Sequence, residues 1–420
     1  MVQIAVLGYG TVGSGVVEVL NTNKNSIAKK TGEEIQIKYV LDLRDFPGDP
    51  IQEKIVHDFN IILNDPEVQI VAEVMGGVEP ACTFTKKALM AGKSVCTSNK
   101  ELVARHGAEL LQTAKENNVN YLFEASCGGG IPIIRPLNSS LTGDQIDEIT
   151  GILNGTTNYI LSKMIQEGSA FDEVLKEAQE KGYAERNPEA DVEGYDACRK
   201  IAILSSLAFG KQVNFEDVYT EGISKISLAD IQYAKAMNHS IKLLASSRRE
   251  GEDVYTMVCP VLVDKEDPLF SVNGVFNAIF VHGNMLGDAM FYGSGAGKLP
   301  TASAVVGDIV DEAKNRGRNV MASWSEEHLT LADVKTSKSQ FFVRVSGTAE
   351  EDLKKTEAVF GRVKPKIRQC DQSDSRSPCR VKEKWRNLQK ISDELKKEKS
   401  LEVPHKIFFR FCGEPLKFYK

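Results

Sequence analysis

The sequence predicts an α/β protein whose first part is a doubly wound parallel sheet. Three observations support this prediction. Short apolar runs alternate with helical patterns over the first 130 residues, the first run leads into a glycine-rich turn, and the later runs end at polar or glycine residues. The predicted strands are residues 1–7, 35–41, 70–75, 94–97 and 120–123, and helical patterns cover 81–91 and 108–117.

The residues that follow the predicted strands mark a binding site. In an open parallel sheet, ligands bind in the crevice beyond the carboxyl ends of the strands. The residues at these ends are Gly8, Asp42, Gly76, Asn99, Lys100 and Glu124. We therefore expect a ligand to lie against this edge of the sheet.

Beyond Pro132 the pattern changes to longer helices and then to strand-like stretches, which predicts a mixed α+β second domain. The expected helices cover 158–167, 170–181, 195–210 and 227–246, and the expected strands cover 255–262 and 275–281. A helix over 303–315 is expected to return to the first domain, 326–338 to form a polar linker, and 341–345 to begin a small third unit. The predicted domains are 1–132 with a return helix near 303–320, 133–302, and 339–420.

Composition restricts the possible function classes. The chain has 420 residues, of which 42% are hydrophobic, so it can bury a sizeable core and form two or three domains. No window approaches 18 uncharged apolar residues, and the first residues lack a basic leader. These features predict a cytoplasmic enzyme without a membrane span.

The cysteines, histidines and charges exclude further classes. The eight cysteines and six histidines have no metal-ligand spacing, which argues against a transition-metal site and favours reduced thiols. The net charge of −6 argues against nucleic-acid binding. Residues 361–420 differ, because they carry 17 Lys and Arg but only 8 Asp and Glu. This segment is strongly basic, lacks a β-pattern from about Lys364, and is expected to pack poorly.

A GxGxxG motif follows the first predicted strand and opens a helix, which is the context that dinucleotide binding requires. Its glycines, Gly8, Gly10 and Gly13, would let backbone N–H groups approach a pyrophosphate. The cofactor preference stays open. Asp42 could accept a hydrogen bond from a ribose hydroxyl, which favours NAD, whereas Arg44 could bind a 2′-phosphate, which favours NADP.

Two segments suggest an anionic small substrate and a proton-transfer group. Residues 151–159 place small and hydrogen-bonding residues before a helix, where free N–H groups can hold a carboxylate. Asp196 and Lys200 are four residues apart on one helix; Lys200 borders its apolar stripe, so its ammonium is expected in a cleft. Lys100 is the second candidate, because it follows the fourth strand and would point towards the nicotinamide.

Two glycine-rich turns have less specific meanings. Cys127 could be an acyl-enzyme nucleophile, but no activating histidine is nearby, and a buried apolar role is favoured. Carbonyl groups of the same turn, beside Glu124, could hold a hard monovalent or divalent cation. The turn at 293–303 could close over the cofactor from the other side.

Six motifs together resemble the homoserine dehydrogenase family. They are GYGTVGSG at Gly8, TSNKELVARHG at Thr97, EASCGGGIPII at Glu124, GILNGTTNYIL at Gly151, ADVEGYDACRK at Ala190 and GSGAGKLPTASAVVGD at Gly293. They occur in order between about residue 2 and residue 320. The family reduces aspartate 4-semialdehyde to homoserine with NADPH or NADH, on the route to threonine, methionine and isoleucine.

The resemblance implies a Rossmann-type domain, a substrate and dimerisation domain, and an ACT-like regulatory module. It implies NADP or NAD, a monovalent cation (Na⁺ or K⁺), and a homodimer or homotetramer. Lys100 and Lys200 resemble the proton-transfer lysines. The implied substrate residues are Gly155, Thr156, Glu185, Asp191 and Asp196. The implied cofactor residues are Gly8, Gly10, Thr11, Val12, Gly13, Arg44, Gly76, Thr97, Ser98, Asn99, Lys100, Gly295 and Ala296. The implied cation ligands are the Glu124 carboxylate and the carbonyls of Cys127, Gly129 and Ile131.

The chain departs from the family pattern in two places. Asn187 stands where members commonly have an aspartate, in the sequence Ala184-Glu185-Arg186-Asn187-Pro188. Residues 341–347 resemble the first strand of the regulatory module, but the usual Asp-x-Pro-Gly-Val turn is absent. The module has either degenerated or been rewritten by a reading-frame change, so threonine feedback is not predicted.

Two rival functions fit parts of the sequence. A phosphorylating aldehyde dehydrogenase would use Cys127 and require phosphate. A nucleotide-sensing regulator would bind the cofactor tightly without turnover.

Overall fold

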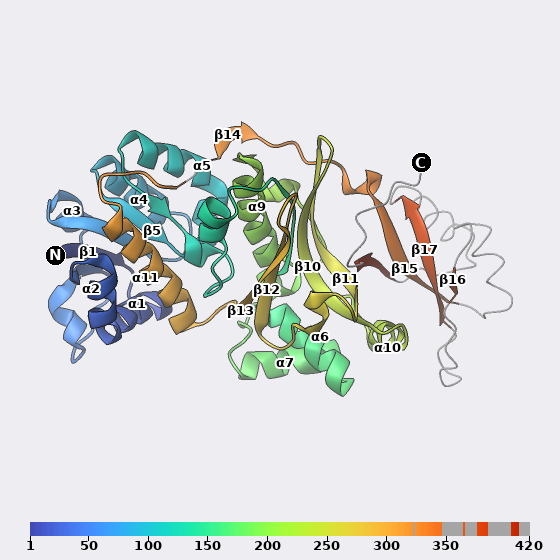
Figure 1. The fold of residues 1–420 in the computed structure, drawn as a ribbon. Coiled ribbons are helices and arrows are strands. Elements are labelled where there is room, and N and C mark those ends of the chain that lie inside the picture. Colours follow the sequence, from blue (N-terminus) through green and yellow to red (C-terminus); the bar gives the residue numbers. More distant parts are fainter. Residues whose placement is uncertain (322–323, 347–363, 366–375, 385–404, 411–420) are drawn as a thin grey trace. The chain divides into compact units, whose positions relative to one another are not determined.

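The computed structural model describes residues 1–321, 324–346, 364–365, 376–384 and 405–410, which form two compact units (Figure 1). The first unit contains Met1–Ile149, Arg199–Asp217 and Ala278–Thr330. The second contains Thr150–Cys198, Val218–Asn277 and the described part of Leu331–Lys420. The domain boundaries 1–132, 133–302 and 339–420 stay a prediction, and much of the last range lies outside the described residues.

The first unit contains a six-stranded parallel sheet, which confirms the predicted Rossmann-type class. The strand order β3-β2-β1-β4-β5-β6 reverses direction beside β1, where such sheets bind dinucleotides. Strand β1 is buried at almost every position, as expected where helices cover both faces of a sheet. The strands are β1 (Val2–Leu7), β2 (Ile35–Leu41), β3 (Ile55–Val56), β4 (Val68–Glu73), β5 (Ser94–Thr97) and β6 (Tyr121–Leu122).

Six helices of the described residues belong wholly to the first unit. Helix α11 packs closely on α1, because a Cβ on Gly15 would lie only 2.9 Å from the Cβ of Ala302. It begins before residue 303, where the pattern placed its start. The helices are α1 (Thr11–Thr22), α2 (Lys24–Thr31), α3 (Phe59–Asn64), α4 (Ala81–Met90), α5 (Lys100–Glu116) and α11 (Lys298–Lys314).

The second unit is mixed α+β, as predicted. Its longest pairing is the antiparallel hairpin of β10 (His239–Glu250) and β11 (Asp253–Asp264), in which Leu244 is opposite Cys259. Its helices are α6 (Gly155–Glu167), α7 (Phe171–Glu180), α8 (Glu189–Val192) and α10 (Leu228–Ala236). Helix α9 (Tyr195–Phe209) continues from the second unit into the first.

The second sheet has ten strands, in the order β13-β12-β7-β10-β11-β18-β15-β17-β16, with β9 paired to β11. A separate two-stranded sheet pairs β8 (Lys211–Gln212) with β14 (Ser325–His328). The other strands are β7 (Ile146–Ile152), β9 (Tyr219–Thr220), β12 (Phe276–Gly283), β13 (Gly287–Ser294), β15 (Lys338–Ser346), β16 (Lys364–Pro365), β17 (Arg376–Lys384) and β18 (His405–Arg410).

The predicted helix over 227–246 is wrong in its second half. Helix α10 ends at Ala236, and Asn238 adopts a φ of +59°, which a continuing right-handed helix cannot accommodate. From His239 the chain is a strand that pairs with β11 along its whole length. The apolar residues of this run suit a buried strand as well as a helix, and the pairing partner decides between them.

The segment after residue 325 also differs from its pattern. Strand β14 lies in the range expected to be a polar linker, and β17 and β18 lie where no β-pattern was found. Strand β17 pairs antiparallel with β15, so this basic stretch is extended although its sequence has no β-pattern. Within the described residues, none of the helices combines the length and the apolar character needed to cross a membrane.

Candidate active site

The glycine turn after β1 has the geometry of a phosphate-binding loop. Gly8 has a φ of +99°, and a Cβ on Gly13 would overlap the carbonyl oxygen of Gly8. Gly10 is the N-cap of α1, and a Cβ placed on it would meet no atom within 4 Å. The turn therefore needs glycine at Gly8 and Gly13, and the open space at Gly10 lies in front of the helix N-terminus, where N–H groups favour an anion. Thr11 and Val12 form the first positions of that helix.

The two residues that leave the coenzyme open, Asp42 and Arg44, bind each other. Arg44 donates to the Asp42 carboxylate from Nε and Nη2, each at 2.9 Å, and to the carbonyl of Tyr9 at 3.2 Å. The Tyr9 amide also donates to Asp42, at 2.8 Å. Hydrogen bonds from Arg44 hold the pKa of Asp42 well below its usual range. A ribose or a 2′-phosphate at this end of the sheet would meet the Asp42 carboxylate and the Arg44 guanidinium already hydrogen-bonded to each other.

The ends of β4 and β5 carry a second group of predicted cofactor residues. Gly76 follows β4, and Thr97 ends β5. Asn99 is the N-cap of α5, where its Oδ1 accepts from the Leu102 amide at 3.1 Å. Lys100 is the first residue of that helix. Ser98 lies between Thr97 and Asn99, and its amide donates to the Glu73 carbonyl oxygen at 3.4 Å.

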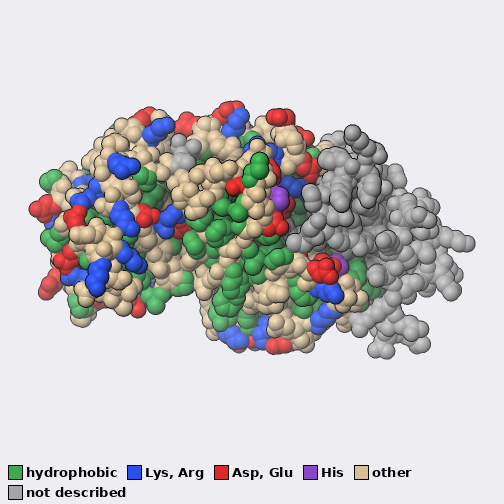
Figure 2. Space-filling model, in the orientation of Figure 1, with side chains coloured by type: hydrophobic (Ala, Val, Ile, Leu, Met, Phe, Trp, Pro, Cys, Tyr) green, Lys and Arg blue, Asp and Glu red, His purple; other side chains and the backbone are tan. Residues whose placement is uncertain are grey.

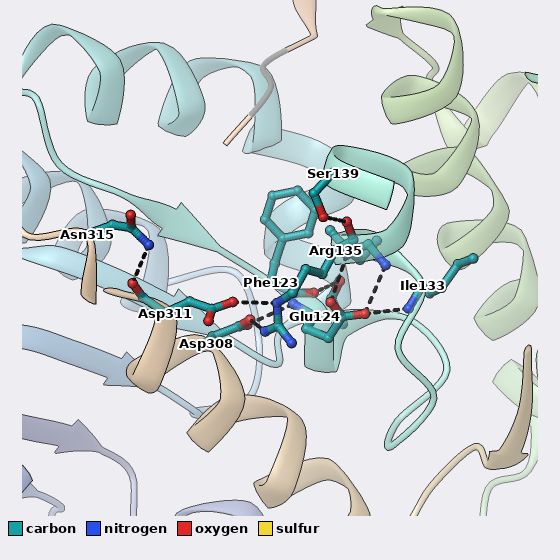
Figure 3. A network of polar contacts seen from close by, with 10 residues as sticks. Phe123, Glu124, Ile133, Arg135, Ser139, Asp308, Asp311 and Asn315 are labelled. Atoms are coloured by element: carbon teal, nitrogen blue, oxygen red, sulfur yellow. Dashed lines mark hydrogen bonds and ion pairs between the residues drawn. The ribbon is translucent and has the colours of Figure 1, made fainter. Parts of the chain in front are cut away.

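The Glu124 carboxylate is the centre of a buried network (Figure 3). It accepts backbone N–H groups from Ile133 at 2.5 Å, Ile134 at 2.9 Å and Arg135 at 2.8 Å. Three such donors stabilise a buried carboxylate. They also fix the segment 124–135, which contains the predicted cation ligands.

Two acidic residues of α11 surround the Arg135 guanidinium (Figure 3). Nη2 donates to Asp308 at 2.7 Å, and Nε lies 2.5 Å from an Asp311 oxygen. Asp308 also accepts the Glu124 amide, at 2.9 Å. Burial, with the nearby Glu124 and Asp311 charges, raises the pKa of Asp308 to about 8, although Arg135 opposes this.

The predicted cation loop and the second glycine-rich loop are in contact. Gly129 has a φ of +56°, and a Cβ on it would lie 2.5 Å from the carbonyl of Gly295. Its neighbour Gly130 donates its amide to Ser294, at 3.1 Å. The structure thus joins Cys127, Gly129 and Ile131 on one loop to Gly295 and Ala296 on the other.

Cys127 is completely buried, and its Sγ lies 3.7 Å from the backbone oxygen of Lys200. A thiol in this position packs against α9 and offers no exposed nucleophile. Lys200 itself is only 8% exposed, whereas Lys100 is partly exposed on α5. Both candidate lysines lie in the first unit.

The predicted substrate residues lie in the second unit, where Asn154 connects two of them. Asn154 Nδ2 donates to Asp191 at 2.7 Å and to Asp196 at 2.9 Å. Its Oδ1 accepts the Thr157 amide at 2.9 Å, so the same residue caps α6. This arrangement brings two carboxylates to the helix N-terminus.

The remaining substrate residues lie around the start of α6. Thr156 donates its hydroxyl to the Tyr183 carbonyl, at 2.6 Å. A Cβ on Gly155 would lie 2.8 Å from the carbonyl oxygen of Val275, so only glycine fits there. Glu185 is exposed, with its carbonyl accepting from Gln179, and Asn187 is exposed two residues later.

An open parallel sheet with a dinucleotide-type glycine turn at its reversal point defines a dinucleotide-binding protein. Two family models match the chain. The homoserine dehydrogenase NAD-binding domain matches residues 8–124, and homoserine dehydrogenase matches 132–310. The chain belongs to the homoserine dehydrogenase family.

Similar proteins support this assignment over most of the chain. The chain is 44% identical to the homoserine dehydrogenase of Bacillus subtilis over 321 residues, which cover 75% of this chain and 73% of the relative. It is 48% identical to the enzyme of Synechocystis over 317 residues, which cover 74% and 73%. The crystal structure of the Thiobacillus denitrificans enzyme matches with a TM-score of 0.90 and 32% identity over 98% of this chain and 99% of that one.

A further solved structure bears on the cofactor. A hyperthermophilic archaeal homoserine dehydrogenase in complex with NADPH matches with a TM-score of 0.63 and 28% identity, covering 74% of this chain and 97% of that one. For this chain, the match to the NAD-binding domain supports a nicotinamide cofactor. The predicted family and enzyme class are confirmed, and the two rival functions are not favoured.

Sequence reasoning missed three residues of these clusters. The sequence did not assign roles to Glu73, Asn154 and Arg135, although each forms at least two hydrogen bonds. Asn154 had the clearest signal, because it precedes a helical pattern as an N-cap residue would. Arg135 and Glu73 have partners distant in the sequence, which no local pattern reveals.

Proposed function

We propose that this chain catalyses reversible hydride transfer between NAD(P)H and L-aspartate 4-semialdehyde, giving L-homoserine, on the route to threonine, methionine and isoleucine. The observation that carries this proposal is the 44–48% identity to homoserine dehydrogenases over three quarters of the chain. The glycine turn supports it, because its glycines leave the N-terminus of α1 open to an anion. The nicotinamide supplies the hydride when the cofactor is bound.

Lys200 or Lys100 donates the proton that the reduced aldehyde oxygen requires. A buried ammonium such as Lys200 stabilises developing negative charge more strongly than one in water. In the oxidation direction the same lysine accepts the proton from the homoserine hydroxyl. Gly155, Thr156, Glu185, Asp191 and Asp196 bind and orient the substrate.

The test is the loss of reduced-nicotinamide absorbance with purified chain and aspartate 4-semialdehyde, using NADPH and NADH in parallel. We expect turnover that needs the semialdehyde but not phosphate. Turnover that requires phosphate and stops on thiol alkylation would instead assign an aldehyde dehydrogenase that uses Cys127. Tight cofactor binding without turnover would assign a sensor.

The coenzyme depends on Asp42 and Arg44. Arg44 is 62% exposed at its side chain and could turn from Asp42 towards a 2′-phosphate, whereas Asp42 retains two backbone donors that hold it in place. This favours NADPH as the preferred coenzyme, with Arg44, Gly76, Thr97, Ser98, Asn99, Lys100, Gly295 and Ala296 completing the cofactor site.

A monovalent cation, Na⁺ or K⁺, binds the carbonyls of Cys127, Gly129 and Ile131 beside the Glu124 carboxylate. Buried Glu124 supplies a negative charge, and the carbonyl oxygens are ligands that hard cations prefer. Activity assayed in a tetramethylammonium buffer, with and without added K⁺ or Na⁺, tests this. Equal activity in all three would contradict a cation requirement.

The chain forms a homodimer through β13. Every second residue of this strand is exposed, and the exposed apolar side chains at the strand and its preceding turn are Met285, Leu286, Met290 and Tyr292. Figure 2 shows hydrophobic side chains gathered over the middle of this face of the molecule. An apolar edge of this kind is a typical subunit contact.

Mass measurement by light scattering tests the dimer. Tyr292→Lys should shift the chain to monomers, whereas Met90→Lys, at an exposed methionine of α4, should not. A tetramer that resists Tyr292→Lys would indicate another interface. A cytoplasmic location stays a prediction. Threonine feedback is not predicted, and most of the C-terminal segment on which it would depend lies outside the described residues.

A further inference from the structure

Glu73 is a fully buried carboxyl to which no role has yet been given. It is the last residue of β4, directly opposite Thr97 at the end of β5 and Leu7 at the end of β1. It therefore lies at the carboxyl edge of the sheet, at the point where the strand order reverses. This is the edge that carries the glycine turn and Lys100.

Hydrogen bonds connect Glu73 to both of its neighbouring loops. Its Oε2 accepts the Thr97 hydroxyl at 2.6 Å, and its Oε1 accepts the Met75 amide at 2.7 Å. Its backbone carbonyl accepts the Ser98 amide at 3.4 Å. The single residue thus holds the segment after β4 and the segment after β5 together.

The connection continues to the start of α5. Thr97 Oγ1, which donates to Glu73, accepts the Asn99 amide at 2.9 Å. Asn99 caps α5 through the Leu102 amide and donates Nδ2 to the Gly77 carbonyl at 2.7 Å. The Thr97 hydroxyl and the Asn99 side-chain amide each have one orientation that makes both of their hydrogen bonds. The direction in which Thr97 donates is therefore set by Glu73, and Lys100 follows in the next position.

The segment after Glu73 also touches the glycine turn. A Cβ on Gly8 would lie 3.2 Å from Met75 Cγ and 3.3 Å from the Val74 carbonyl oxygen. The Val74 amide donates to the Leu7 carbonyl at 3.0 Å. A change at Glu73 would therefore reach the cofactor side of the turn as well as the start of α5.

We propose that Glu73 is a positioning residue of the dehydrogenase, which in its ionised form aligns Thr97, Asn99 and the Lys100-bearing start of α5 with the glycine turn. Glu73 does not contact the substrate in this role. The hydrogen bonds that the Glu73 carboxyl accepts from Thr97 and Met75 both favour its ionised form. Protonation turns one of its two oxygens into a donor and so weakens one of these bonds. The inference rests on the proposed function, since a displaced Lys100 segment matters for turnover only in the dehydrogenase.

The ionisation of Glu73 falls in the physiological range. Burial raises its pKa to about 7, although Thr97 and the Met75 amide oppose the rise. Its titratable neighbours are Cys96 on β5 and Tyr121 on β6, and burial raises the pKa of each well above its ordinary value, so both stay neutral. The charges of Asp308 and Glu312 on α11 also raise the pKa of Cys96. Burial raises the pKa of both acids.

The central test is Glu73→Gln, which keeps the shape but cannot ionise. The wild-type kcat should fall as the pH drops through about 7. In Glu73→Gln we expect kcat to be about tenfold lower and to lack this acid limb, because a misplaced catalytic segment costs turnover. KM for the semialdehyde should change less than twofold. An acid limb that persists in Glu73→Gln, or an unchanged kcat, would overturn the proposal.

Two controls separate positioning from general packing. Tyr121→Phe removes the nearest titratable hydroxyl and should keep both kcat and the acid limb. Glu116→Gln replaces an exposed acid at the other end of α5 and should also have no effect. Glu73→Asp keeps a carboxyl and should restore a pH-dependent limb at reduced kcat. A Tyr121→Phe enzyme that loses the limb would contradict the assignment of the titration to Glu73.

A readout without substrate distinguishes this inference from the proposed function. Hydrogen exchange of the cofactor-free chain reports the Asn99 and Leu102 amides directly. Both should exchange at least about tenfold faster in Glu73→Gln than in wild type, while amides near Glu116 do not change. If exchange accelerates but the wild type has no turnover, the positioning holds and the proposed function fails. Equal exchange in both proteins would refute the positioning role.

Discussion

A buried carboxyl in the first unit and a buried ammonium in the second have pKa values that shift in opposite directions. In the first unit, among the described residues, burial raises the pKa of the Glu73 carboxyl to about 7. In the second unit, burial lowers the pKa of the Lys242 ammonium to about 7. The physical cause is the same, since a low dielectric disfavours the charged form of either group. The direction of the shift is opposite because one group is charged when deprotonated and the other when protonated.

The hydrogen-bond partners show what each unit uses its buried group for. Glu73 receives donors from segments that border the glycine turn. Lys242 donates instead to Asn158 Oδ1 at 3.2 Å, the Val272 carbonyl at 2.5 Å and Asn273 Oδ1 at 2.9 Å. These acceptors tie α6 to the segment before β12. The lysine therefore stabilises the packing of the second unit, whereas the carboxyl aligns the cofactor side of the first.

The largest effect should come from the buried lysine of the first unit. Lys200→Met should lower kcat by about 10²- to 10⁴-fold and leave the Kd for the cofactor unchanged, because general-acid catalysis is lost and the glycine turn is intact. Steady-state kinetics and cofactor fluorescence titration measure both quantities. Lys211→Met, at a lysine 41% exposed in its side chain, is the control. An unchanged kcat in Lys200→Met would remove this lysine from the mechanism.

Lys242→Met should change stability instead of chemistry. The methionine fills most of the same volume but leaves the buried acceptors of Asn158 and Val272, and the exposed Asn273, without the ammonium donor, so we expect the free energy of unfolding to fall by about 2–3 kcal/mol. Urea denaturation measures the loss, with Lys235→Met at an exposed position of α10 as the control. The kcat of the folded protein should stay within about threefold of wild type. A large loss of kcat at unchanged stability would reverse the roles assigned to the two lysines.

The stability of the two units should respond to pH in opposite directions. Between its ordinary pKa near 4.5 and about 7, folded Glu73 binds more protons than the unfolded chain does, so the free energy of unfolding falls as pH rises. Between about 7 and 10.5, unfolded Lys242 binds more protons than the folded residue does, so the free energy of unfolding rises with pH. Each slope can reach about 1.4 kcal/mol per pH unit.

Single variants identify the source of each slope. Glu73→Gln should make the decline on the acid side less steep, since buried Asp308 and Glu312 also contribute to it, and should leave the alkaline rise unchanged. Lys242→Met should do the reverse. Denaturation followed at a series of pH values measures both slopes, and a variant that changes both slopes equally would show that the two units do not titrate independently.

Local and distant interactions explain what the sequence could predict. The turn at Gly8 to Gly13 was predictable because a strand, its glycines and a helix are adjacent in the chain. Strand β10 was not, because its residues suit either structure until they pair with β11. Glu73 was overlooked because its partner Thr97 lies 24 positions away in the chain. Its role depends on which strand ends meet, which is a property of the sheet.

The acidic pair in the second unit shows the same limit. Asp191 and Asp196 resembled substrate residues by motif, but the amide that joins them belongs to Asn154, which lies 37 positions before Asp191. The motif identified the two acids, but only the fold shows that Asn154 connects them. Residues with several distant partners are therefore the ones that motif reading omits.

The smallest effect should come from the exposed Arg44, which pairs with the partly buried Asp42 in the first unit. Arg44→Ala removes the guanidinium that could bind a 2′-phosphate, so NADPH affinity should fall by about tenfold, the value of one hydrogen bond to a charged group. NADH affinity should stay equal or rise, because Asp42 then has a free oxygen for the ribose hydroxyl. Fluorescence titration with both coenzymes measures the ratio of NADPH affinity to NADH affinity. The effect of Arg44→Ala on this ratio should decrease with added salt, unlike the effects of the variants at buried Glu73 and Lys242. Equal losses for NADPH and NADH would mean that Arg44 holds the Tyr9 loop and does not select the coenzyme.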